Sequence, residues 1–259
     1  MKWILGTLGL LYKLYIALVF VLTLLLFYPF IVVTLLSKKT KHWSFALHVA
    51  WSYLVRMLAF VWIHRVNKLN LPQAPYLIVS NHSSYFDIFF LPSILPQHRF
   101  LFLGKSELLS YPLIKTLFKY LHIPVYRKNG VKAGRSFIQS KQAIKDGWSL
   151  VIFPEGGIPD EGLPTMMPFK EGAFKLAIQC KIPLVPLTFL NHYHMFTDPG
   201  KIFGSAHPGI SKVYVHQPIT PADYAHMNEK ELSEYVFQLL AKPLRERGLM
   251  ESDAEHKHN

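Results

Sequence analysis

The sequence contains a single cysteine, Cys180, among its 259 residues. One thiol cannot form a disulfide within the chain, and it cannot supply the several thiolates of a cysteine-based zinc cluster.

Acidic residues are also scarce, with 16 Asp and Glu against 28 Lys and Arg, which gives a formal net charge of +12. This excess of positive charge favours an anionic partner such as nucleic acid, anionic lipid headgroups or a phosphorylated substrate. Hydrophobic residues make up 51% of the chain, more than is usual for a soluble domain, so the composition favours lipid. The sequence shows no basic stripe with interleaved aromatics and no known nucleic-acid-binding motif, so we expect no nucleic-acid partner.

Charge is absent altogether from residues 14–37. This length suffices for a helix to cross a bilayer, which takes roughly 20 residues, and the run is too long for a signal-peptide core. Pro29 interrupts it, and a second largely apolar segment, residues 43–66, follows a basic patch at residues 38–41. We predict that residues 1–70 form a membrane-anchoring helical hairpin, which either spans the bilayer or dips into it. The lysines of the patch favour the cytoplasmic face of the inner (plasma) membrane.

From residue 71 onward, short strand-like runs alternate with amphipathic helical patterns. This alternation predicts an α/β domain over residues 71–259, with a mostly parallel central sheet flanked by helices. The expected strands are Tyr76–Val79, Phe100–Leu103, Ile123–Tyr126, Ser149–Phe153, Leu184–Thr188 and Val213–Val215; the expected helices are Pro112–Leu121, Val131–Lys145, Gly172–Cys180 and a last helix capped by Asn228.

A polar stretch, Ser-Asn-His-Ser-Ser at residues 80–84, follows the first of these strands, and an apolar helical segment resumes at Ile88. His82 and Asp87 bracket this strand-to-helix turn, which can fold the carboxylate back towards the imidazole. Two interpretations are open at this point. Asp87 caps the helix and His82 is an ordinary loop histidine, or the carboxylate fixes the tautomer of the ring and leaves its other nitrogen as a base.

Further polar residues come directly after other predicted strands. Lys105 follows the second strand, Arg127 closes the third, and Pro-Glu-Gly-Gly at residues 154–157 ends the fourth. Each has an ordinary interpretation, as a surface cation or a turn. Because ligands bind beyond the carboxyl ends of the strands in an open α/β sheet, their shared placement favours one functional crevice.

Five sequence blocks in this order resemble the glycerolipid acyltransferase family, and in particular its bacterial 1-acyl-sn-glycerol-3-phosphate acyltransferases. Asn81, His82 and Asp87 are similar to the family's N-H-x4-D block. The other similar blocks are G-K-x-E-L at residues 104–108, an arginine-terminated block at 123–127, F-P-E-G at 153–156 and a V/I-P-x-x-P block at 182–186. The N-terminal hydrophobic helices are also typical of the bacterial members.

The resemblance implies acyl transfer from an acyl thioester, acyl-CoA or acyl-carrier protein, to the free hydroxyl of 1-acylglycerol-3-phosphate, giving phosphatidic acid in phospholipid biosynthesis. The implied partners are membrane lipids, the acyl donor and lysophosphatidic acid. No cofactor and no metal are implied. A thioester needs no enzyme nucleophile, and the chain lacks a G-x-S-x-G elbow, so no acyl-serine is expected.

The resemblance also implies a role for each matched residue. His82 would act as the general base and Asp87 would orient it. The expected substrate and phosphate contacts are the side chains of Lys105 and Arg127, the carboxylate of Glu155 near the acceptor's glycerol hydroxyls, and the backbone amides of Gly156 and Gly157.

The chain departs from the family at two places. The family continues F-P-E-G with Thr-Arg, and here Gly157 and Ile158 stand instead. Since that arginine is thought to help hold the acceptor's phosphate, we expect Lys170, just before a helix N-terminus, to supply the missing cation. The usual glycine before the second block is replaced by His122.

Three alternatives remain at this point. In the first alternative, the acceptor is a different lysolipid, such as a lyso-ornithine lipid. In the second, the chain is a membrane-bound metal-dependent hydrolase, in which His192 and His194 lie on one face of a strand as a zinc pair with His82 or Asp87. Finally, the chain is a non-enzymatic membrane adaptor, although an adaptor has no need of a base, cations and a carboxylate at strand ends.

Overall fold

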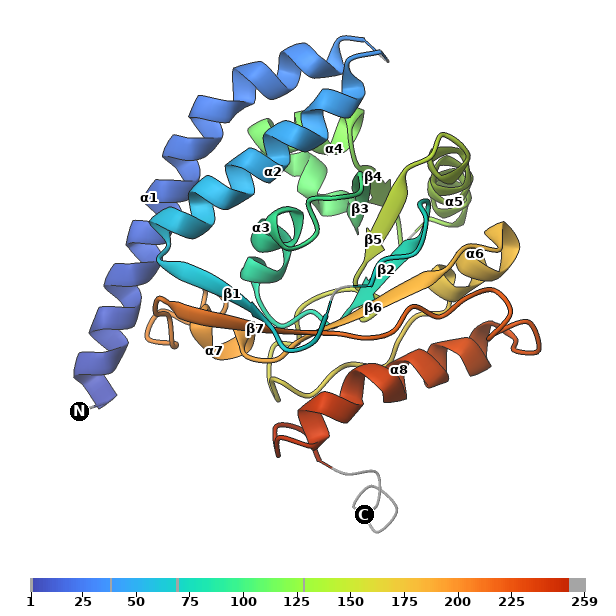
Figure 1. The fold of residues 1–259 in the computed structure, drawn as a ribbon. Coiled ribbons are helices and arrows are strands. Elements are labelled where there is room, and N and C mark those ends of the chain that lie inside the picture. Colours follow the sequence, from blue (N-terminus) through green and yellow to red (C-terminus); the bar gives the residue numbers. More distant parts are fainter. Residues whose placement is uncertain (1, 38, 69, 128, 252–259) are drawn as a thin grey trace.

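The computed structural model describes residues 2–37, 39–68, 70–127 and 129–251 (Figure 1). Its strands form one seven-stranded sheet in the order β1-β7-β6-β2-β5-β3-β4. Neighbouring strands are parallel except for β6 and β7. The predicted α/β fold with a mostly parallel sheet is confirmed; Lys38, in the basic patch, lies outside the described residues.

The elements agree closely with the predicted ones from residue 71 onward. The strands are β1 Val61–Arg65, β2 Leu77–Ser80, β3 Phe100–Lys105, β4 Ile123–Val125, β5 Ser149–Ile152, β6 Leu184–Phe189 and β7 Gly209–Val215. The helices are α1 Lys2–Leu35, α2 Lys41–Leu58, α3 Tyr85–Ile94, α4 Pro112–Tyr120, α5 Gly130–Lys145, α6 Gly172–Cys180, α7 His192–Met195 and α8 Glu229–Arg245, with a 3-10 helix η1 at Ser106–Ser110.

Strand β2 lies at the centre of the sheet, between β5 and β6. Leu77 pairs with Leu150 of β5 on one side and with Leu184 of β6 on the other, and all three are fully buried. Strands that are covered on both faces are expected to be continuous apolar runs, as these are. The carboxyl ends of β2, β3, β4, β5 and β6 therefore meet at one edge of the sheet.

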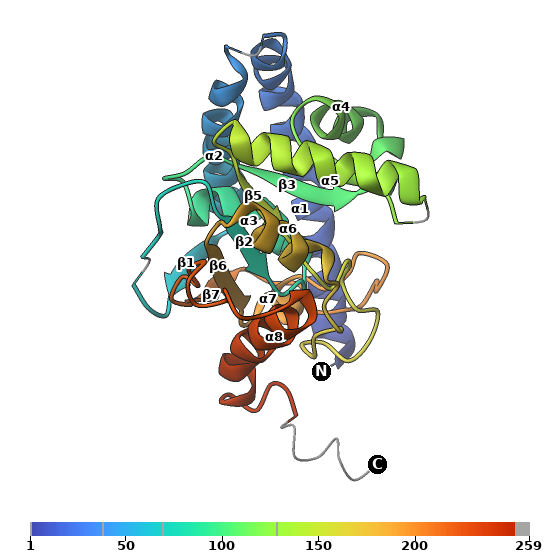
Figure 2. The same cartoon turned by 90° about the vertical axis from the view of Figure 1, so that its right-hand side faces the viewer.

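Helices cover both faces of the sheet. Helices α5, α6 and α8 lie together on one face, which is turned to the viewer in Figure 2. The other face is covered by α3, which packs against α2, and α2 in turn packs against α1 (Figure 1). The N-terminal helices are therefore part of the layer that covers the sheet.

The end of the predicted helical hairpin differs from our expectation. Residues 61–65, assigned to the hairpin, form strand β1, which pairs with β7 at the edge of the sheet. The helix stops at Leu58, and Phe60 turns the chain with a left-handed φ of 51°. A non-glycine residue rarely adopts this conformation. Because neither glycine nor proline stands at this position, nothing in the sequence indicates that the helix ends here.

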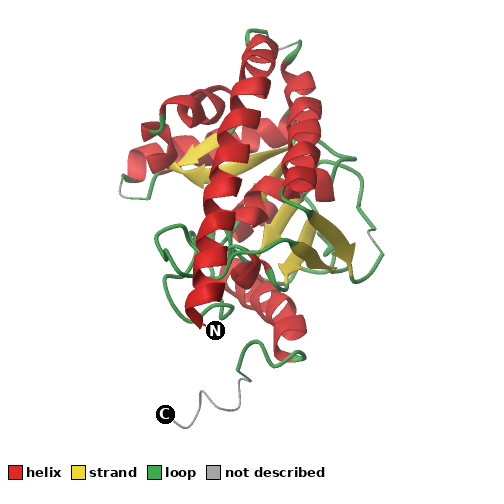
Figure 3. Ribbon diagram, turned by 90° about the vertical axis from the view of Figure 1, so that its left-hand side faces the viewer, coloured by secondary structure: helices red, strands yellow, loops and turns green. Residues whose placement is uncertain are grey.

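Helix α1 runs along the side of the molecule for its whole length, beginning at the N-terminus in Figure 3. One stripe of the helix is buried, including Gly9, Ile16, Leu24 and Ile31. The opposite side is apolar and exposed along its length. Among the described residues, residues 4–35 form the one helix long and apolar enough to cross a membrane, and only 28% of its most apolar window is buried.

Candidate active site

The turn between β2 and α3 brings His82 and Asp87 together. Ser84 is the N-cap of α3, and its hydroxyl accepts the N–H of Phe86. Asp87, which we expected at the N-cap, is the third residue of the helix, and its carboxylate accepts the N–H of Ser84 at 2.9 Å in a capping box. One carboxylate therefore both caps the helix and binds the imidazole of His82.

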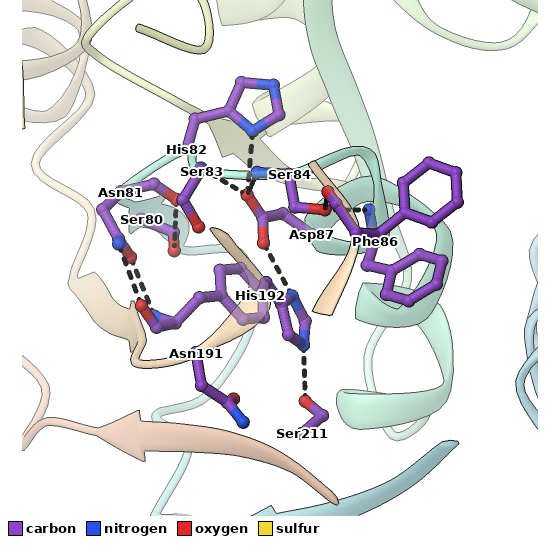
Figure 4. Close-up of polar contacts among 12 residues, drawn as sticks. Ser80, Asn81, His82, Ser83, Ser84, Phe86, Asp87, Asn191, His192 and Ser211 are labelled. Carbon is purple, nitrogen blue, oxygen red and sulfur yellow. Dashed lines mark hydrogen bonds and ion pairs between the residues drawn. The ribbon is translucent and has the colours of Figure 1, made fainter. Parts of the chain in front are cut away.

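The Asp87 carboxylate is fully buried and accepts four hydrogen bonds (Figure 4). Its Oδ2 accepts from Nδ1 of His82 at 3.0 Å, from the N–H of Ser83 at 2.7 Å and from the N–H of Ser84. Its Oδ1 accepts from Nδ1 of His192 at 2.7 Å. The proton of His82 is thereby held on Nδ1, and Nε2 is left as the basic nitrogen.

The sequence did not reveal His192 as a partner of Asp87. His192 follows β6 and opens the short helix α7, so it reaches the same edge of the sheet as His82. Its ring is fully buried, and its Nε2 accepts the hydroxyl proton of Ser211 at 2.5 Å. The available signal was its position four residues after the end of the predicted strand Leu184–Thr188. The site is therefore a chain of hydrogen bonds that runs from Ser211 through His192 and Asp87 to His82.

The two histidines keep the Asp87 carboxylate ionised. Burial by itself raises the pKa of this carboxyl, but the hydrogen bonds from His192 and His82 outweigh it and hold the pKa below its usual range. A permanent negative charge next to Nδ1 of His82 stabilises an imidazolium whenever Nε2 accepts a proton.

Packing around His82 fixes the orientation of its ring. The imidazole stacks on Phe153, with the ring centroids 4.2 Å apart. The preceding residue, Asn81, ties the end of β2 to β6, because its side chain donates to the carbonyl of Phe189 and accepts the N–H of the same residue. The His82 imidazole is therefore held by its neighbours in sequence and by two adjacent strands.

Glu155 has a different place from the one we expected. Its carboxylate is buried, and its two oxygens accept the backbone N–H groups of His82 at 2.7 Å and of Met167 at 2.8 Å. Burial raises its pKa to about 7, and the two N–H groups lower it by less. With both oxygens engaged inside the protein, Glu155 positions the backbone of His82 and does not point at a glycerol hydroxyl.

Three cationic side chains gather around Gly156 and Gly157. A Cβ atom on Gly156 would lie 2.8 Å from Nζ of Lys170 and 3.1 Å from Nη2 of Arg127, and one on Gly157 would lie 2.7 Å from Nζ of Lys105. Burial lowers the pKa of Lys170, and the charges of Arg127 and Lys105 lower it further. The structure thus brings Lys170 to the two cations predicted at strand ends, and glycines provide the room.

The two glycine amides differ in what they offer a ligand. The N–H of Gly156 donates to the carbonyl of Phe153 at 3.0 Å, so this amide, which we expected to face a phosphate or an oxyanion, is already engaged. For Gly157 the described part of the chain shows no such partner. Of these two glycines in the described part of the chain, Gly157 is therefore the one that retains a backbone donor beside the cations.

A cavity of about 350 Å³ opens at His82. Its polar end includes His82, Lys105 and Arg127. The rest is lined mainly by apolar side chains of α1, α2, α3, β3 and α4, among them Phe20, Val55, Phe89, Leu103 and Leu117. A single space therefore offers a base and cations at one end and an apolar interior behind them.

The geometry contradicts the zinc pair of the metal-dependent alternative. His192 and His194 lie in helix α7, where we expected a strand, so they do not share a face. Both ring nitrogens of His192 are engaged with Asp87 and Ser211, while Nδ1 of His194 contacts Nε2 of His207 at 3.3 Å. Within the described ranges, no group of three or more His, Cys, Asp or Glu side chains could hold a metal ion.

Comparison with known sequences bears on the same region. The model of the family described as Acyltransferase matches residues 62–190. The chain is 29% identical over 183 residues to the 1-acyl-sn-glycerol-3-phosphate acyltransferase of Bacillus subtilis, covering 70% of this chain and 85% of that protein. It is 31% identical over 152 residues to the mouse 1-acyl-sn-glycerol-3-phosphate acyltransferase alpha, covering 58% of this chain and 51% of the mouse protein. The chain thus spans about half the length of the mouse relative and 43% of a Brassica napus relative.

The fold is also similar to a solved structure. The crystal structure of the 1-acyl-sn-glycerophosphate (LPA) acyltransferase PlsC from Thermotoga maritima superimposes with a TM-score of 0.73 at 20% identity, covering 98% of this chain and 100% of that one. The family match spans the strands whose ends carry His82, Arg127 and Glu155. Through the domain at residues 62–190, this chain belongs to the acyltransferase family.

Proposed function

We propose that the protein transfers an acyl group from an acyl thioester to the free hydroxyl of 1-acylglycerol-3-phosphate, giving phosphatidic acid. One observation carries this proposal: Nε2 of His82 lies where an apolar cavity meets three cations. This nitrogen is free to accept a proton because Asp87 holds the proton of the ring on Nδ1. The cavity suits an acyl chain, the cations suit a phosphate, and a thioester requires only that the attacking alcohol be deprotonated.

The reaction follows from these positions. Nε2 of His82 takes the proton of the acceptor hydroxyl, and the oxygen attacks the thioester carbonyl. As the new C–O bond forms and the C–S bond breaks, the imidazolium returns that proton to the leaving thiolate. Asp87 stabilises the imidazolium between these two proton transfers, and the N–H of Gly157 is available to the carbonyl oxygen as it becomes negative.

The experiment that tests this function uses a bacterial host deficient in 1-acylglycerol-3-phosphate acyltransferase. Expression of the chain should restore phosphatidic acid in a mass spectrum of the lipid extract. Restoration of an acylated ornithine lipid, with no change in phosphatidic acid, would instead favour the second candidate acceptor. The same cells expressing His82→Ala serve as the control.

Lys170 tests the assignment of the phosphate site. We expect Lys170→Ala to raise the KM for 1-acylglycerol-3-phosphate about ten-fold, because a charge-assisted contact to the phosphate is lost. The KM for the acyl thioester should stay the same. Lys175→Ala, an exposed lysine on α6, is the matched control. An unchanged KM for the acceptor in Lys170→Ala would remove Lys170 from the phosphate site.

We further propose that α1 lies in the surface of the membrane. The N-terminal half of the helix is pinned to the domain by Lys13, whose Nζ donates to the carbonyls of Asp198 and Lys201. Its opposite side presents large apolar side chains along its length, such as Leu22 and Leu26, each 57% exposed. A helix with one side on protein and the other side apolar suits insertion into one leaflet.

Vesicle flotation tests this membrane contact. The protein should float with vesicles of anionic phospholipid, and Leu22→Glu combined with Leu26→Glu should abolish flotation, since two charges would have to enter the apolar region of the bilayer. Ile138→Glu replaces an exposed apolar residue on α5, at the opposite face of the sheet, and should float like the unmodified protein. Flotation of the double variant would contradict the proposed orientation.

A further inference from the structure

Two histidines from distant parts of the chain meet inside the apolar cavity. His48 comes from α2, and His122 comes from the turn between α4 and β4; their ring centroids are 5.7 Å apart. Both line the cavity that opens at His82. The mechanism proposed above uses neither of them, and their polar atoms stand among apolar neighbours such as Phe102 and Phe118.

The two rings lie far from the reacting end of the cavity. His122 precedes the amino end of β4, while Arg127 follows its carboxyl end. Five residues of extended chain span roughly 15 Å. A group bound between the histidines therefore belongs to a part of the acyl chain remote from the thioester.

The backbone contacts of the two rings fix where their protons are. Nδ1 of His48 donates to the carbonyl of Ser44 at 2.7 Å, so its Nε2 is an acceptor. This Nε2 is buried, and it has no hydrogen-bond partner among the described residues. Nδ1 of His122 accepts the N–H of Phe102 at 3.4 Å, so its Nε2 carries a proton and is a donor.

One acceptor and one donor side by side match the hydrogen-bonding capacity of a hydroxyl group, which donates one bond and accepts another. A carboxylate only accepts, so it would face the lone pair of His48. Burial, together with His48 and Lys41, holds the pKa of His122 well below its usual range, so this ring carries no charge that could offset a carboxylate at pH 7. A methylene would leave the buried Nε2 of His48 unpaired.

We propose that the cavity selects an acyl chain bearing a hydroxyl group remote from the thioester, with the hydroxyl bound between Nε2 of His48 and Nε2 of His122. The proposal rests on the acyl transfer proposed above, because it takes the cavity as the site of the transferred chain. Next to the two rings is a void of about 10 Å³, close to the size that holds one water. Water is therefore the competing occupant.

The test compares two acyl-CoA thioesters of equal length, one unsubstituted and one hydroxylated near the far end of the chain, across a series of hydroxyl positions. For at least one position, kcat/KM should favour the hydroxylated chain about ten-fold. His48→Phe with His122→Phe should remove this preference by making the end of the cavity remote from His82 apolar, and replacement of both polar partners by rings of similar shape should leave the protein folded.

Two control variants separate selectivity from general damage. Val55→Ala alters the apolar lining of the same cavity and leaves both histidines and the aromatic rings packed on them in place, so it should change both rates alike. His226→Phe, at an exposed histidine, should change neither. Equal rates for the two thioesters in the unmodified protein, at every hydroxyl position, would overturn the inference and would mean that water occupies the site. A preference that survives in the double variant would also overturn it, because the selectivity would then come from another part of the cavity.

A binding measurement keeps this inference distinct from the proposed reaction. In calorimetric titrations with the free fatty acids, the unmodified protein should bind the hydroxylated acid about ten-fold more tightly, and the double variant should not. Failure of every thioester to react, with this binding preference intact, would overturn the proposed reaction and leave the selectivity standing. Acyl transfer without any preference in rate or binding would overturn the selectivity alone.

Discussion

Replacement of His82 by alanine should lower kcat/KM for acyl transfer by about 10²–10⁴-fold or more. The variant loses the nitrogen that deprotonates the acceptor hydroxyl, while its backbone N–H still donates to Glu155. The loss should appear mainly in kcat, because His82 contributes to the proton transfers and the cations hold the acceptor. Release of thiol from acyl-CoA in the presence of 1-acylglycerol-3-phosphate measures it.

A matched control for this variant is His226→Ala, at an exposed histidine far along the chain. It should keep full activity and unfold at the temperature of the unmodified protein. His82→Ala should remain folded but unfold at a lower temperature, because the buried carboxylate of Asp87 loses one of its four hydrogen bonds. Activity of His82→Ala within a few-fold of the unmodified protein would remove His82 as the base.

Replacement of Asp87 by asparagine should cause a fall of similar size, about 10²–10⁴-fold in kcat/KM. The backbone N–H groups of Ser83 and Ser84 both point at Oδ2, so the amide oxygen should remain there and the cap of α3 should survive. The proton of His82 then also stays on Nδ1. The variant therefore removes the negative charge that stabilises the imidazolium and keeps the orientation of the ring, so the loss of activity measures the contribution of the charge.

Nitrogen NMR of histidine-labelled protein tests that reasoning. In Asp87→Asn the His82 ring should keep its proton on Nδ1, as in the unmodified protein, while activity is lost. If the ring instead carried its proton on Nε2, the loss of activity would be due to the wrong tautomer. The experiment would then give no support for stabilisation of the imidazolium by the charge of Asp87. Full activity in Asp87→Asn would contradict the pairing altogether.

The part of the site that the sequence predicted is the part carried by local patterns. His82 and Asp87 stand five residues apart across one turn, so their meeting depends on a few backbone angles. Lys105 and Arg127 were found because each follows an apolar run, and the ends of parallel strands meet at one edge. We predicted Lys170 because the F-P-E-G block lacks the arginine that follows it in the family. In the structure the ammonium of Lys170 lies beside Gly156 of that block.

The features that were missed depend on contacts between distant residues. His192 contacts Asp87 across 105 positions of sequence, and the neighbouring His194 suggested a metal pair instead. Glu155 looked like a substrate contact because its burial, and the two amides that bind it, cannot be read from Pro-Glu-Gly-Gly. Strand β1 was hidden because an apolar run continues through Phe60 without a helix-breaking residue.

Thiol release from an acyl thioester by the purified protein, with and without 1-acylglycerol-3-phosphate, tests the central claim most directly. If His82 activates the acceptor hydroxyl for direct attack, thiol should appear only when the acceptor is present, with one phosphatidic acid formed for each thiol released. A burst of thiol equal to the amount of enzyme without acceptor, with an acyl group left on the protein, would contradict the account.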